Sequence, residues 1–173
     1  AFLDPDLYQD TSADALPDSQ AAYTLMRTAI AQQHRILIWG DFDVDGQTAT
    51  TLLVENLRQL GADVRFHIPV RGAESHGISP SVLQDYLDDG FDLLITCDTG
   101  ITEHQNVAIV RQAGIPVIVT DHHALADTLP EASAVVNPQR LDKNHPLYTL
   151  PGVGVVYKLM EGFYAHQGAD FQA

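Results

Sequence analysis

The chain is poor in several kinds of residue, and each shortage excludes a class of protein. Its 173 residues include one cysteine, Cys97, so no internal disulfide framework can form and a reducing compartment is expected. No apolar run approaches the roughly 20 residues that cross a membrane, and the first residues lack the basic and apolar regions of a signal peptide. We therefore expect a cytoplasmic protein that has no membrane partner.

Basic residues are also scarce. Nine Lys and Arg residues face 23 Asp and Glu residues, which gives a formal net charge of -14. Taken alone, this charge argues against non-specific binding to nucleic acid, which usually requires a basic face. The argument is incomplete, because several acids are candidate metal ligands whose charge bound cations would offset. The hydrophobic fraction of 45% is ordinary for a soluble globular domain.

The order of apolar runs and helical patterns predicts the fold class. Residues 1–18 mix Asp, Pro, Ser and Thr and predict an extended leader, and residues 19–173 predict one domain. The leader's apolar residues that could pack are Phe2, Leu3, Leu7 and Leu16. Strands are predicted at 35–39, 64–68, 93–97, 116–120 and 134–136, and helices at 19–33, 48–60, 80–88, 103–113 and 154–166. This alternation is typical of a three-layer α/β/α fold with a mainly parallel sheet of about five strands.

Three aspartates at alternate positions follow the first predicted strand. In an extended chain, Asp41, Asp43 and Asp45 would project to one side and repel each other unless cations lay between them. The simpler alternative is that Asp41 caps the following helix and that Asp45 forms a turn with Gly46. This alternative suits one aspartate better than three at this spacing. We therefore predict a site where oxygen ligands hold divalent cations.

Two more predicted strands end in polar residues. Asp98-Thr99-Gly100 follows the third strand, and Asp121-His122-His123 follows the fourth. Because ligands of open parallel sheets bind at the carboxyl ends of the strands, we expect these segments and the three aspartates to share one edge. Carboxylates with imidazole suit Mn²⁺ or Mg²⁺. Each motif alone has a plainer alternative, a turn for the first and a polar surface pair for the second.

Other classes of ligand site fit the sequence less well. A nucleotide-binding domain would place a glycine-rich phosphate loop after the first strand, and neither common form of that loop occurs. A receiver-type domain also has acids at strand ends, but it would not supply an Asp-His-His triplet. Metal-assisted hydrolysis remains. The role of His76, in a polar loop between Gly72 and Gly77, is left open.

These motifs resemble the first three motifs of the DHH phosphoesterase superfamily, which is named after its Asp-His-His triplet. They are the segments 41–46, 98–100 and 121–123, in the same order. The sequence is most similar to the RecJ branch of that superfamily, which comprises 5′-to-3′ exonucleases specific for single-stranded DNA. Further segments that resemble this branch are 2–7, 68–71, 76–79, 136–140 and 152–159.

The resemblance implies a two-metal phosphodiesterase that uses Mn²⁺ or Mg²⁺. The implied metal ligands are Asp41, Asp43, Asp45, Asp98 and His122. Asp98 is implied to bridge the two ions, and His123 joins the catalytic set. Asp121 and Thr99 are implied to hydrogen-bond to the ligands. The candidates for phosphate contact are Arg71, Arg140, Gly152 and Gly154, although a surface salt bridge for Arg71 and tight packing for the glycines are equal alternatives.

The sequence departs from the family in places. Trp39 stands where some relatives have a histidine ligand, and Thr99 where cysteine or asparagine is common. The fourth motif and the DHH-associated domain are missing, so we expect a fragment or a shortened copy. The implied function is cleavage from the 5′ end of single-stranded DNA in repair and recombination, with other repair proteins as candidate partners. The alternatives are a phosphodiesterase for oligonucleotides or cyclic dinucleotides, and a catalytically silent binding domain.

Overall fold

Five apolar segments pair as parallel strands in the computed structural model, which describes residues 10–168. The strands are β1 (Arg35–Trp39), β2 (Asp63–His67), β3 (Leu93–Cys97), β4 (Val117–Thr120) and β5 (Ala134–Val136). Their order in the sheet is β2-β1-β3-β4-β5, so the chain crosses over β1 on its way from β2 to β3. This arrangement confirms the predicted α/β fold and its five-stranded parallel sheet.

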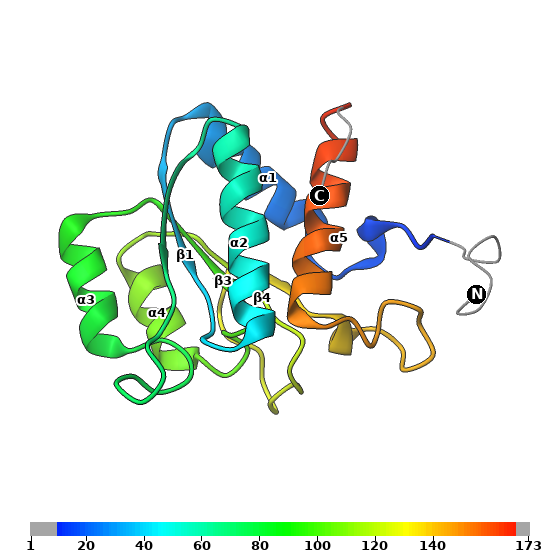
Figure 1. Ribbon diagram of the computed structural model, residues 1–173. Helices are drawn as coiled ribbons and strands as arrows, with labels where there is room; N and C mark the ends of the chain where they lie inside the picture. Colours follow the sequence, from blue (N-terminus) through cyan, green and yellow to red (C-terminus); the bar gives the residue numbers. More distant parts are fainter. Residues whose placement is uncertain (1–9, 169–173) are drawn as a thin grey trace.

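Helices cover both faces of the sheet, as Figure 1 shows. They are α1 (Ser19–Ala31), α2 (Val44–Gln59), α3 (Pro80–Asp89), α4 (His104–Gln112) and α5 (Gly152–Ala165), with short 3-10 helices η2 (Ala13–Ala15) and η3 (Pro138–Arg140). Helices α1, α2 and α5 pack on one face, and α3 and α4 pack on the other. Across residues 10–168, none of the helices combines the length and the apolar character needed to cross a membrane.

The central strand β1 shows why the layers form. Ile36 and Ile38 point into the core beneath α1, α2 and α5, whereas Leu37 and Trp39 point into the core beneath α3 and α4. All four side chains are fully buried. Successive side chains of a strand face opposite sides, so a continuous apolar run stabilises a strand only when both faces are covered.

The segment before α1 differs from the extended leader that we predicted. Residues 13–15 form η2, and Leu16 is buried in the core as one of the predicted contacts. Asp18 adopts a left-handed backbone with φ of 58°, and its Oδ2 accepts a hydrogen bond from the Val135 N–H at 3.0 Å. This part of the chain is therefore tied to strand β5. The contacts predicted for Phe2, Leu3 and Leu7 lie outside the described residues.

The core beneath α2 gives a prediction about stability. Leu53 is fully buried, so Leu53→Ala should lower the free energy of unfolding by about 2–5 kcal/mol through lost apolar contacts and a cavity. Leu125→Ala removes the same atoms from a side chain that is 38% exposed, and it should change the free energy by only about 0.5 kcal/mol. Urea unfolding of both variants measures the difference. Equal losses would show that this face of α2 does not form the core.

Candidate metal centre

The three alternate aspartates do not lie in one extended stretch. Helix α2 begins at Val44, four residues before the predicted start, because Asp43 caps it: the Asp43 Oδ1 accepts the Gly46 N–H at 2.9 Å. Asp45 lies in the first turn of the helix, where the dipole favours an acid. Asp41, directly after β1, is buried. The three aspartates therefore do not all lie in an extended chain, because Asp45 is part of the helix, although oxygens of Asp41 and Asp43 come within 4.8 Å of each other.

Asp98, at the end of β3, has a buried carboxylate. Its side chain is 1% exposed and its φ is 59°, an unusual backbone conformation for a residue other than glycine. Within the described part of the chain, Oδ1 accepts no hydrogen bond, although His122 Nε2 approaches to 3.1 Å. Burial raises the pKa of Asp98 to about 7, and the negative charges of Asp45 and Asp43 add to this effect. A buried carboxylate oxygen without a hydrogen bond is costly unless a cation binds it.

Asp121 organises the loop after β4. Its Oδ2 accepts the Ile101 N–H at 2.9 Å, and its Oδ1 accepts the His122 N–H at 2.7 Å and lies 2.7 Å from the His123 Nδ1. Burial alone would raise the pKa of Asp121, but the hydrogen bonds from His123 and Ile101 lower it below its ordinary value. The same contact raises the pKa of His123 to about 9. Asp121 thus holds the His123 ring by Nδ1 and leaves Nε2 available.

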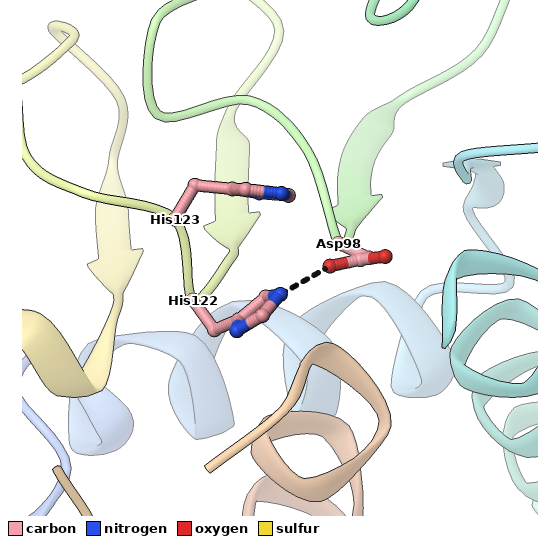
Figure 2. Close-up of side chains that lie close together, drawn as sticks. All are labelled: Asp98, His122 and His123. Carbon is pink, nitrogen blue, oxygen red and sulfur yellow. Dashed lines mark ion pairs between the residues drawn. The ribbon is translucent and has the colours of Figure 1, made fainter. Parts of the chain in front are cut away.

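These side chains form two groups that could each hold a metal ion. One group is Asp41, Asp43 and Asp98, and the other is Asp98, His122 and His123. In each group the ligand atoms lie within 4.8 Å of one another. Figure 2 shows both imidazoles, from the loop after β4, extending toward Asp98 at the end of β3. The donors are carboxylate oxygens and imidazole nitrogens, a set that fits Mn²⁺ and Mg²⁺.

Asp45 lies at the border of the second group and has other partners. Its Oδ2 is 3.6 Å from the His122 Nε2. The same carboxylate accepts the Gly152 N–H through Oδ2 and the Val153 N–H through Oδ1, each at 2.7 Å. Both N–H groups belong to the first turn of α5. The Gly152 N–H, predicted as a phosphate donor, is therefore already bound to an acid.

Of the two arginines predicted to contact phosphate, one lies beside the aspartate motif and the other is bound elsewhere. Arg71 is exposed in the loop after β2, and its guanidinium carbon lies 4.7 Å from the centre of the Phe42 ring. Arg140 instead donates to the Asp18 Oδ2 at 2.7 Å and to the carbonyl of Val135. Arg71 thus remains next to the aspartate motif, whereas the guanidinium of Arg140 ties η3 to β5.

Two predicted residues remain, Thr99 and Gly154, and both help to shape the backbone near the site. Thr99 is buried, and its carbonyl accepts the Thr96 hydroxyl at 2.6 Å, which helps to hold the loop after β3. A Cβ at Gly154 would lie 3.0 Å from the Pro151 ring, so this glycine packs closely at the start of α5.

One residue of the site was not assigned from the sequence. The His76 Nδ1 lies 3.3 Å from the Asp41 Oδ2, and its ring contacts Phe42 in a tilted arrangement with 4.2 Å between the ring centres. His76 borders a cavity of about 390 Å³ that is also lined by Asp41, Asp98 and His123. The sequence signal for His76 was its place in a polar loop between two glycines. The approach of His76 to Asp41, however, depends on the pairing of β1 with β2.

Comparison with known proteins identifies relatives of the chain. Residues 35–172 match the N-terminal domain of the DHH family. The single-stranded-DNA-specific exonuclease RecJ of Salmonella typhimurium is 43% identical over 140 residues, which cover 80% of this chain and 24% of that protein. RecJ of Bacillus subtilis is 39% identical over 134 residues, which cover 78% of this chain and 17% of that protein. The chain thus spans about a quarter or less of the length of these relatives.

Solved structures show the same fold. A crystal structure of exonuclease RecJ bound to manganese has a TM-score of 0.84 and 34% identity, and the match covers 92% of this chain and 40% of that one. RecJ from Thermus thermophilus in complex with Mn²⁺ has a TM-score of 0.76 and 33% identity, with 90% and 22% covered. RecJ from the same organism has also been solved in complex with Mg²⁺. The family match covers most of the chain, and we conclude that this chain belongs to the DHH family and contains its N-terminal domain.

Proposed function

We propose that this domain binds two divalent cations, Mn²⁺ or Mg²⁺, and forms part of the phosphodiester-cleaving site of a RecJ-like exonuclease. The observation that carries the proposal is the buried Asp98 carboxylate, which belongs to both ligand groups and has one oxygen without a hydrogen bond among the described residues. A carboxylate has two oxygens and can bridge two ions, which lie roughly 3.5–4 Å apart in two-metal sites. The relatives solved with manganese or magnesium support this choice of ions.

The two groups suggest a division of the ligands. Asp41 and Asp43 would hold one ion with Asp98, and His122 and His123 would hold the other with Asp98. In this proposal His123 is a ligand, and Asp121 orients its ring. Asp45 stays at the border of the second group, with its Oδ2 3.6 Å from the His122 Nε2. Bound ions of this kind lower the pKa of a coordinated water and stabilise the charge that develops on a phosphate in the transition state.

The charge of the domain explains why cations would be required. A chain with a net charge of -14 repels a DNA backbone, and the acids of the site add to that repulsion. Cations at Asp98 would offset most of the negative charge of these acids and would bind a phosphate directly. In the proposal, exposed Arg71 contributes a protein cation beside the aspartate motif, with its guanidinium held over the Phe42 ring.

The substrate is proposed from the relatives. They are named as exonucleases specific for single-stranded DNA, and the chain spans only 24% or 17% of their length. We therefore propose metal binding for this chain. Removal of nucleotides from a 5′ end, in cytoplasmic repair and recombination with other repair proteins, is proposed for a protein that also contains the rest of the relatives' length.

Metal binding is tested first at Asp98. Asp98→Asn keeps the shape of the side chain but removes its charge, and it should lower Mn²⁺ affinity by more than the roughly 10- to 100-fold typical of an outer hydrogen-bond partner. Asp127→Asn removes the same charge from an exposed position outside both ligand groups and should leave affinity unchanged. Titration calorimetry with Mn²⁺ measures both variants. Equal affinities in the two variants would contradict a bridging role for Asp98.

Nuclease activity is tested in the longer protein. A form that contains this domain and the rest of the relatives' length should release mononucleotides from 5′-phosphorylated single-stranded DNA only when Mn²⁺ or Mg²⁺ is present. Asp98→Asn should abolish this release, because the loss of the shared ligand disrupts both ion sites, and Asp127→Asn should retain it. If the longer form binds Mn²⁺ but releases no nucleotides, the domain serves binding alone and the exonuclease proposal is wrong.

A further inference from the structure

We propose that the first turn of α5 positions Asp98 for metal binding, with Gly152 packed directly against the carboxylate. The proposal rests on the proposed metal site and deepens it. It assigns Gly152 a role through Asp98, in place of the phosphate contact that the resemblance implies. A second acid, Asp45, fixes the turn in its place.

The contact between Gly152 and Asp98 leaves no room for a side chain. A Cβ on Gly152 would lie 2.5 Å from the Asp98 Oδ1, 2.6 Å from its Cγ and 2.7 Å from its Cβ. Real Cβ atoms essentially never show contacts below 3.0 Å. Even alanine at position 152 would therefore force the carboxylate or the helix to move.

Asp98 has little freedom to move away from this contact. Its side chain is 1% exposed, its φ is 59°, and its N–H donates to the carbonyl of Thr120 at 3.0 Å. The His122 Nε2 also approaches the same Oδ1, at 3.1 Å. The carboxylate thus contacts both α5 and the imidazole, so that a shift forced at Gly152 would move the Asp98 Oδ1.

The turn itself is anchored from α2. Residue Pro151, at the N-cap of α5, provides no side-chain hydrogen bond to the helix. Asp45 replaces that cap from a distant part of the chain by accepting the Gly152 and Val153 N–H groups, each at 2.7 Å. An acid at a helix N-terminus is favoured by the free N–H groups and by the helix dipole. The position of α5 is therefore set by an acid of the metal centre itself.

The experiment compares two glycine-to-alanine variants within the same helix. Gly152→Ala should lower Mn²⁺ affinity at least about tenfold, the smaller effect expected when a ligand is displaced and not removed. Gly162→Ala also creates a clash, since its Cβ would lie 2.8 Å from that of Ala13, but it is almost three turns further along α5. This control should lower the melting temperature and leave Mn²⁺ affinity unchanged. Unchanged affinity in Gly152→Ala would overturn the proposal.

A double-mutant cycle, measured by melting temperature, tests the contact in the absence of metal. Asp98→Gly removes the three atoms nearest to a Cβ at position 152, and glycine accepts a φ of 59° without strain. Gly152→Ala should therefore lower the melting temperature of the unsubstituted chain but not that of the Asp98→Gly chain. An equal decrease in both would overturn the proposed contact. If the unsubstituted chain binds no Mn²⁺, the proposed function is wrong. The double-mutant cycle would then still show whether Gly152 packs against Asp98.

Discussion

The buried charge of Asp98 is the constraint on which the rest of the site depends. A carboxylate that is removed from water and surrounded by other acids is unfavourable unless its oxygens find hydrogen-bond donors or cations. Here burial and the charges of Asp45 and Asp43 raise the pKa of the Asp98 carboxyl to about 7, and its Oδ1 has no hydrogen bond within residues 10–168. Two groups of candidate ligands meet at this residue. The arrangement is unfavourable without metal and suited to binding it.

The aspartates of the candidate metal centre have different structural roles, although they are chemically alike. Asp43 caps α2, Asp121 holds the loop that carries the two histidines, and Asp45 caps α5. Each of these aspartates satisfies backbone or imidazole N–H groups, which reduces the repulsion that their charges would otherwise cause. Among these aspartates, Asp98 alone has a buried oxygen without a hydrogen bond in the described structure. The surrounding acids thus build the frame in which that oxygen is held.

Much of this organisation could be predicted from the sequence, and the limits of prediction have physical causes. The strands were predicted because apolar runs are local signals, and the meeting of the three motifs followed from the parallel sheet. Helix α2 was predicted to start too late, because Asp43 can serve as a cap or as a ligand and the sequence does not distinguish these uses. Arg140 was predicted to contact phosphate, but it binds Asp18, which lies 122 residues away in the sequence. A pairing over such a distance cannot be read from local sequence.

By itself, the sequence determined the fold class, the family and the edge of the sheet where the acids and histidines gather. Those conclusions depend on residue type and on spacing along the chain, and both can be read locally. Only the tertiary structure decided the partner of each side chain. It brought His76 to Asp41, joined Asp45 to a helix 107 residues further along, and pressed Gly152 against Asp98. The first of these pairings depends on the pairing of β1 with β2, and the other two depend on the packing of α2 and α5 on one sheet face, which spacing along the chain does not encode.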